Sequence, residues 1–162
     1  MSKNNQSFIS YYNQFKDKIF NYLFYRTGFD RELAEDLTSE VFIKAFKSFN
    51  SFDKDKQFQS WIFTITKNHL INHYKADKKN IPIEDVEQTL SILPEDIGQA
   101  LEIKSIIGII EKMDSSDKEP LLMRYVSDLT NQEIAQILDK DEGAIRTQIS
   151  RSLAKLRTLL NS

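Results

Sequence analysis

Apolar residues recur at helical spacing along most of the chain, and no segment alternates between apolar and polar residues as a strand does. The pattern predicts an all-α fold. The expected helices cover residues 7–26, 31–49, 57–78, 98–113, 116–126, 131–138 and 142–160.

The last two predicted helices are joined by a short polar corner. Thr130 is followed three residues later by Glu133, and this pair is the signature of a capping box at the start of a helix. The helix after the corner carries apolar residues on its inner side, at Ile145, Ile149, Leu156 and Leu160. This arrangement predicts a helix-turn-helix, whose second helix can enter the major groove of duplex DNA.

The second helix of this unit has no acidic residue after Glu142 and is basic from there to its end. Short and cationic side chains gather opposite the apolar stripe, where they suit base edges and phosphates. The residues expected to contact duplex DNA are Gly143, Arg146, Thr147, Ser150, Arg151 and Lys155. The alternative interpretation is the solvated face of an ordinary bundle helix.

The net charge of −2 hides an uneven distribution along the chain. Residues 80–97 contain five acids and no base, and Pro82 and Pro94 interrupt helical pattern there. We therefore expect a linker over 80–97, between a helical domain over 1–79 and a second one over 98–162 that holds the helix-turn-helix. A surface loop within one domain is the alternative.

The predicted helix over 31–49 has an apolar side and an acidic side. The apolar side consists of Leu33, Leu37, Val41, either Ala45 or Phe46, and Phe49. The other side gathers Glu32, Glu35, Asp36, Ser39 and Glu40. An acidic face does not bind DNA, so it indicates either a solvated surface or a basic protein partner.

The third helix carries an aromatic residue followed by amides and cations along one narrow stripe. Its members are Trp61, Thr64, Asn68, Asn72, Lys75 and Lys79. Such a surface suits single-stranded or partly melted nucleic acid, because bases stack on rings and lysines hold phosphate. Trp61 taken alone is equally typical of a core residue.

Several function classes are excluded at this stage. The chain has no cysteine, and no run is apolar enough to span a bilayer, so we expect a cytoplasmic protein without direct membrane insertion. His69 and His73 are four residues apart, but Leu70 follows His69 and no third ligand is evident. We expect no metal, no cofactor, no small-molecule substrate and no catalytic activity.

The ordered motifs resemble those of an extracytoplasmic-function (ECF) sigma factor over nearly the whole chain. The segments that carry the resemblance are 34–42, 58–68, 121–126 and 129–138. The resemblance implies a dissociable initiation subunit of bacterial RNA polymerase, with core RNA polymerase and promoter DNA as its partners. Family members are often held by an anti-sigma protein, and nothing in the sequence identifies one.

The resemblance also implies a role for each surface. The acidic helix would dock on the core enzyme through Glu35, Asp36, Ser39 and Glu40. The stripe from Trp61 to Lys79 would bind the melted non-template strand of the minus-ten element, and the last helix would bind the minus-thirty-five element as duplex. The acidic linker would run through the polymerase.

Some residues depart from the family pattern. Asp139 and Lys140 stand in the corner where a small or glycine residue and an apolar one are frequent, although Asp tolerates left-handed backbone better than most residues. Asp128 replaces a frequent Gly, Ala144 a frequent Thr, and Leu153 a common Arg. Two other functions stay open: an autonomous helix-turn-helix regulator, and an adaptor that uses these domains for protein contact only.

Overall fold

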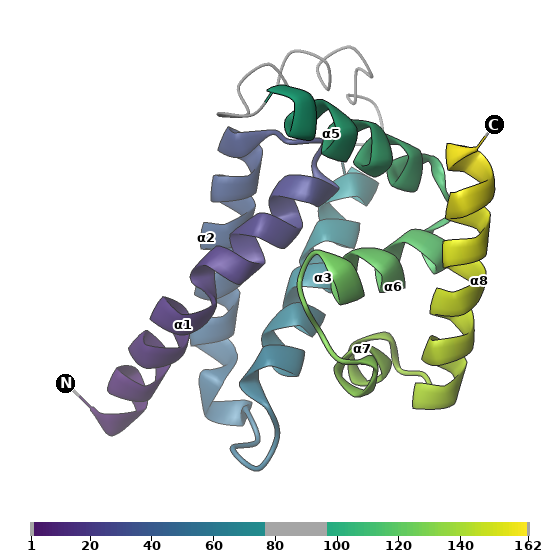
Figure 1. Cartoon of the computed structure of the whole chain (residues 1–162). Coiled ribbons are helices and arrows are strands. Elements are labelled where there is room, and N and C mark those ends of the chain that lie inside the picture. The colour runs from purple at the N-terminus through teal and green to yellow at the C-terminus, as the bar shows by residue number, and fades with distance from the viewer. Residues whose placement is uncertain (1, 77–96, 162) are drawn as a thin grey trace.

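The computed structural model describes residues 2–76 and 97–161 of the chain. The helices are α1 (Lys3–Arg26), α2 (Arg31–Ser48), α3 (Phe58–Ala76), α5 (Ile97–Lys112), α6 (Ser115–Tyr125), α7 (Asn131–Leu138) and α8 (Glu142–Leu160), with a short 3-10 turn at Phe49–Ser51 (Figure 1). No strand occurs among these residues, which confirms the all-α prediction. Lys79 and the predicted linker, except for Ile97, lie outside the described residues.

Capping residues set the helix boundaries. α1 begins at Lys3, four residues before the expected start, because the Ser2 hydroxyl accepts a hydrogen bond from the Asn5 amide at 3.1 Å. The Asp30 carboxylate caps α2 in the same way by accepting from the Leu33 amide. Between these helices Gly28 and Phe29 both adopt positive φ, at 67° and 66°, which gives the chain a tight reversal.

The N-terminal half, α1 to α3, packs around aliphatic residues with almost no exposed surface, among them Ile19, Leu23, Val41 and Ile62. Aromatic rings extend this core, and the Tyr11 ring stacks on that of Phe58 with a centroid distance of 4.2 Å. On α2 it is Ala45 that is buried, whereas Phe46 is 51% exposed. The open choice between these two residues is therefore resolved in favour of Ala45.

The C-terminal half, α5 to α8, contains the predicted helix-turn-helix. The capping box is confirmed, because Thr130 and Glu133 exchange two hydrogen bonds of 3.1 Å. Asp139 closes α7 in left-handed backbone, with φ 55° and ψ 52°, so the corner tolerates Asp as expected. The prediction for Leu160 was wrong: it is 44% exposed, because the last turn of α8 runs past the core.

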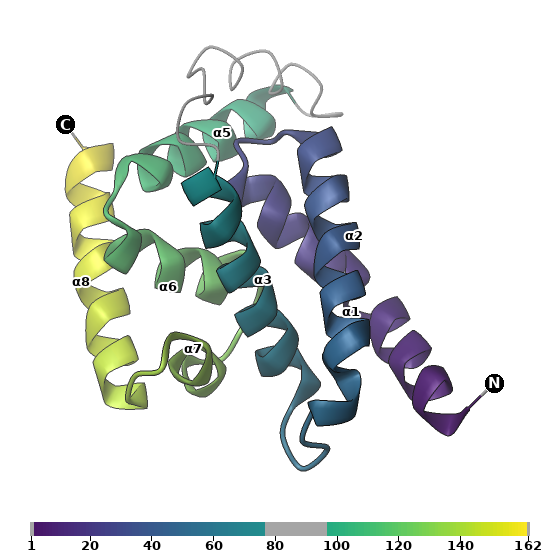
Figure 2. The same cartoon turned by 180° about the vertical axis from the view of Figure 1, so that it is seen from behind.

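The two halves pack directly on each other. α6 lies between α3 and α8 in both views (Figures 1 and 2), and α7 packs on α3. The Lys67 amine on α3 donates to the carbonyl of Ile137 near the end of α7, at 3.2 Å. The Gln59 amide on α3 also bonds to the carboxylate of Glu133 on α7.

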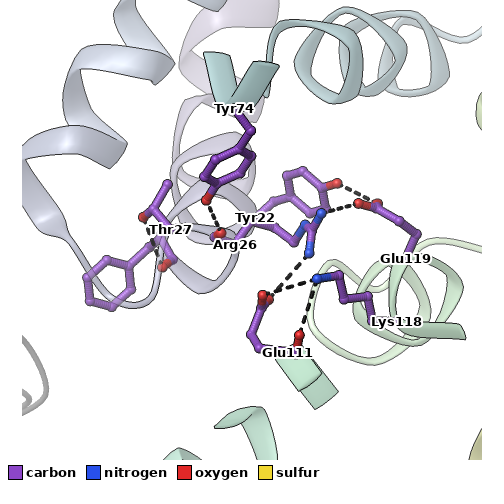
Figure 3. Close-up of polar contacts among 8 residues, drawn as sticks. Tyr22, Arg26, Thr27, Tyr74, Glu111, Lys118 and Glu119 are labelled. Atoms are coloured by element: carbon purple, nitrogen blue, oxygen red, sulfur yellow. Dashed lines mark hydrogen bonds and ion pairs between the residues drawn. The ribbon is translucent and has the colours of Figure 1, made fainter. Parts of the chain in front are cut away.

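A polar cluster with a buried centre and a partly exposed edge completes the contact between the halves, and we call it the interface cluster. Its members are Tyr22, Arg26, Glu111, Lys118 and Glu119 (Figure 3). The Arg26 guanidinium lies 2.5 Å from one Glu119 oxygen and 3.4 Å from a Glu111 oxygen. The Tyr22 hydroxyl donates to the other Glu119 oxygen at 2.7 Å.

Burial keeps the tyrosines of this region protonated. Burial first, and then the negative charge of Glu119, raise the pKa of Tyr22 well above its ordinary value. Burial likewise raises the pKa of Tyr74 to about 12, and its hydroxyl donates to the carbonyl of Arg26 at 2.5 Å. Both hydroxyls therefore act as hydrogen-bond donors at neutral pH.

Candidate nucleic-acid interface

α8 presents an exposed face opposite its buried one. Ile145, Ile149 and Ser152 face the core. Five of the residues predicted to contact duplex DNA share the outer face and are all exposed: Gly143, Arg146, Thr147, Ser150 and Arg151. Arg146 is 70% exposed and pairs only loosely with Glu142, at 3.4 Å. Such a surface pair costs little to break, so this guanidinium is free to contact a phosphate or base edge.

Lys155, the sixth predicted contact on this helix, has a different environment. Its amine lies 2.9 Å from the carboxylate of Asp117 on α6, a residue with only 3% of its surface exposed. The same carboxylate accepts hydrogen bonds from Gln148 at 2.7 Å and Ser152 at 2.9 Å. The hydrogen bond from Lys155, opposed by burial and assisted by Ser152, lowers the pKa of Asp117. Sequence reasoning missed Asp117, which stands in a short helix with other charges around it.

The α3 stripe is graded from buried to exposed. Trp61 and Thr64 are half-buried, while Asn68, Asn72 and Lys75 are exposed. The Trp61 ring packs against Phe52 at a centroid distance of 4.9 Å, so this indole belongs partly to the core, as its alternative interpretation held. The amides and the lysine are open to a ligand.

α2 adds two cations to this stripe that sequence reasoning missed. An open hollow of about 330 Å³ lies between α2 and α3. Its lining consists of Lys44, Lys47, Ser48, Ile65, Asn68, His69 and Asn72. Lys44 and Lys47 are three residues apart at the end of an otherwise acidic helix, a spacing that could have singled them out. Amides and ammonium groups around one hollow suit a nucleotide, with its base edges and phosphate.

The acidic face of α2 is exposed at all four residues predicted to bind the core enzyme, Glu35, Asp36, Ser39 and Glu40. Glu40 also contacts α3, because its carboxylate lies 2.7 Å from Nε2 of His69. One turn further along, Ile43 and Phe46 are 55% and 51% exposed, so an apolar surface continues the acidic one.

His69, which shares a helix with His73, thus has a carboxylate partner of its own. Within residues 2–76 and 97–161, no three His, Asp or Glu side chains gather closely enough to hold a metal ion. In the same ranges, no helix is both long and apolar enough to cross a membrane.

Two family matches cover the segments that carry these surfaces. Residues 11–80 match the family described as Sigma-70 region 2, and residues 103–156 match Sigma-70, region 4. The first match contains the acidic face of α2 and the α3 stripe, and the second contains the helix-turn-helix. Together the two matches cover most of the chain.

Individual relatives are ECF sigma factors. The chain is 28% identical to the ECF RNA polymerase sigma factor BldN of Streptomyces coelicolor over 155 residues, which cover 92% of the chain and 58% of BldN. It is 29% identical to the ECF RNA polymerase sigma factor SigW of Bacillus subtilis over 159 residues, which cover 90% of the chain and 84% of SigW. The chain belongs to the ECF sigma factors.

The fold is also that of solved members of this family. The sigma factor RpoE of Bartonella quintana, solved in complex with the anti-sigma factor NepR, superposes with a TM-score of 0.74. The superposition covers 96% of this chain and 98% of RpoE at 17% sequence identity. This likeness therefore concerns the fold, and the helices of both halves take part in it.

Membership in the ECF sigma factors gives each surface a position in the family. The acidic face and the α3 stripe lie in region 2, and the cationic face of α8 lies in region 4. Asp117 and Lys155 lie in region 4 as well, and Lys44 and Lys47 in region 2.

Proposed function

We propose that this ECF sigma factor binds core RNA polymerase and directs it to promoters that it reads through two separate helices. The observation that carries the proposal is the cationic face of α8, which is exposed over its whole length and backed by a buried helix-turn-helix core. A region 2 segment with its own polar stripe precedes it, which supports a second DNA contact in the same chain.

Each surface receives a role under this proposal. Gly143, Arg146, Thr147, Ser150 and Arg151 bind the minus-thirty-five element as duplex, because a major groove admits a helix with short and cationic side chains. The α3 stripe binds the melted minus-ten strand, since amides can hydrogen-bond base edges and lysines can hold phosphate. The acidic face of α2 docks on a basic surface of the core enzyme.

The packed arrangement of the two halves has to open for this function. The two promoter elements lie about 25 base pairs apart, which is about 85 Å of duplex at about 3.4 Å per base pair. A compact chain of 162 residues has a radius of gyration of about 15 Å, and hence a diameter of about 40 Å. The closed molecule therefore cannot reach both elements of a straight duplex, and the residues between Ala76 and Ile97 would tether the separated halves.

The proposal extends to partners and location. The protein acts in the cytoplasm, where the polymerase is, and it catalyses no reaction of its own. RpoE was solved with an anti-sigma factor, which supports an anti-sigma protein as a further partner for this chain. The exposed Ile43 and Phe46 beside the acidic face suit such a protein contact.

Run-off transcription tests the function directly. Purified protein is mixed with core enzyme and genomic DNA, and the transcripts are sequenced. We expect transcripts that start downstream of one shared pair of promoter elements and that disappear when this protein is omitted. Tight binding to an inverted repeat without core enzyme would instead favour an autonomous regulator, and core binding without any transcript would favour an adaptor.

A further inference from the structure

We propose that Asp117 is a positioning residue for promoter recognition, which fixes the rotation of α8 and keeps Lys155 away from DNA phosphate. The proposal rests on the proposed function, because it concerns how the duplex-reading helix is held. Under this proposal Lys155 pairs with Asp117 and does not contact DNA, although its position on a basic helix predicted a DNA contact.

The Asp117 carboxylate accepts hydrogen bonds from three side chains on one side of α8. Asp117 lies on α6, which runs crosswise to α8 and contacts it (Figure 2). Its Oδ1 accepts from Gln148 Nε2 at 2.7 Å and from Ser152 Oγ at 2.9 Å, and its Oδ2 accepts from Lys155 Nζ at 2.9 Å. All three donors come from α8, and one buried acid therefore contacts two turns of that helix.

The spacing of the donors defines which way α8 faces. Gln148, Ser152 and Lys155 are four and three residues apart, so they form one stripe along the helix. At about 100° per residue, this stripe lies on the opposite side of the helix from Arg146 and Ser150, while Arg151 lies between the two sides. A contact on one side of a helix sets the direction of the other side, so Asp117 orients side chains that it does not touch.

Electrostatics keeps Lys155 in place. The Asp117 side chain is 4% exposed, whereas the Lys155 side chain is 60% exposed. If Lys155 moved to a phosphate, the carboxylate would stay buried without a cation, which is far more costly than losing one exposed phosphate contact. Lys155 is therefore retained by Asp117 when DNA binds.

The experiment uses the holoenzyme, reconstituted from core polymerase and the full chain. The probes are a promoter duplex identified by the transcript sequencing above and the same duplex with its upstream element scrambled. Binding is measured by fluorescence anisotropy over a series of salt concentrations. The variants are Asp117→Asn, which removes the charge and keeps the shape, Lys155→Met, and the double variant. Asp114→Asn is the matched control, an exposed acid on the same helical segment whose side chain makes no cap hydrogen bond.

In Asp117→Asn we expect the preference for the intact over the scrambled duplex to fall about tenfold, the scale of one lost base contact. The released Lys155 should then bind phosphate, so the slope of log affinity against log salt should steepen by about 0.9. The double variant should return to the wild-type slope. Lys155→Met alone should leave that slope unchanged, and so should Asp114→Asn.

These results differ from those of a merely structural residue, whose loss would weaken binding to both duplexes. An unchanged preference or an unchanged slope in Asp117→Asn overturns the proposal. A shallower slope in Lys155→Met also overturns it, because Lys155 would then be a phosphate contact in the wild type. If the wild-type holoenzyme itself ignores the upstream element, the proposed function has failed, and the two failures are thereby distinguished.

Discussion

Arg26 on α1 and Glu119 on α6 form an ion pair of 2.5 Å at the boundary between the two halves of the molecule. Both side chains are largely buried, with 8% and 11% of their surface exposed. Tyr22 donates to the second Glu119 oxygen, and Glu111 pairs with the second terminal nitrogen of Arg26, whose Nε has no partner among the described residues (Figure 3). This pair joins residues that lie far apart in the chain and holds the molecule in its closed arrangement.

Glu119→Gln should therefore shift the free protein towards an open arrangement. The substitution leaves Arg26 with Glu111 at 3.4 Å as its nearest carboxylate. Removing one partner of a buried pair costs about 3–5 kcal/mol, which here falls mainly on the contact between the halves. Energy transfer between dyes on α2 and α8 should report a longer distance.

The matched control for this variant is Glu35→Gln, which removes an exposed carboxylate paired with Arg31 at 3.5 Å. An exposed pair is worth at most about 1 kcal/mol, so the distance between the dyes should not change. Equal distances in Glu119→Gln and the wild type would show that the interface cluster does not hold the halves together.

Arg146→Ala and Arg151→Ala should each reduce dependence on the minus-thirty-five element. If the guanidinium contacts a base pair, its loss should cost about 1–3 kcal/mol of binding free energy. If it contacts a phosphate, its loss should lower the slope of log affinity against log salt by about 1. Transcription from promoters with intact and scrambled upstream elements measures the first effect, and affinity for core enzyme should stay the same. Lys112→Ala on α5, also an exposed cation, should leave both unchanged.

Reversing Asp36 and Glu40 to Lys should weaken binding to core polymerase. The new cations would face a basic partner, and like-charge contact across an interface costs several kcal/mol. Titration of labelled protein with core enzyme checks this at two salt concentrations. Asp17→Lys on α1, an exposed acid on another helix, is the control. Unchanged affinity in the double reversal would remove the acidic face from the docking surface.

Asn68→Ala should slow promoter opening more than it weakens closed-complex binding. Asn68 lines the hollow between α2 and α3 and can hydrogen-bond a base only after that base leaves the duplex. A fluorescent base at the minus-ten position reports opening. Lys47→Ala should show the same defect and a weaker dependence of opening on salt, because a phosphate contact is lost. Asn13→Ala on α1 should show no defect. A defect confined to closed-complex binding would contradict this role.

Acid should destabilise the C-terminal half partly through Asp117. Its pKa in the folded protein lies below the ordinary value of 3.8, mainly because Lys155 donates to it. The ionised carboxylate therefore stabilises the fold above about pH 4, and this contribution is lost as the pH falls through the lowered pKa. Urea unfolding at pH 7 and at pH 3 should show a smaller loss of stability in Asp117→Asn than in Asp114→Asn. Equal losses in the two variants would contradict the assignment.

Local signals predicted the helices well. The capping box at Thr130 and the helical periodicity placed α7 and α8 at their observed boundaries. Both signals depend on residues a few positions apart, which the sequence states directly. The start of α1 differed by four residues because the Ser2 cap lies in a polar segment without periodicity.

Long-range contacts were the part that the sequence could not predict. Nothing near Arg26 indicates that its partner is Glu119, and nothing near Lys155 indicates Asp117. Lys44 and Lys47 join the stripe of α3 only through the packing of α2 on α3. The faces expected to bind DNA and the core enzyme are exposed at their main residues, while their binding roles remain predictions.

Residues on almost every side of α3 have a structural contact or a proposed DNA-binding role. Its inner residues fill the core, Gln59 and Lys67 hold α7, and Asn68 and Asn72 face the solvent. Only a few positions on α3 can therefore be substituted to change minus-ten preference without destabilising the core or the contact with α7. We expect homologous lineages to diversify their upstream preference through the outer face of α8 more readily than their downstream preference through α3.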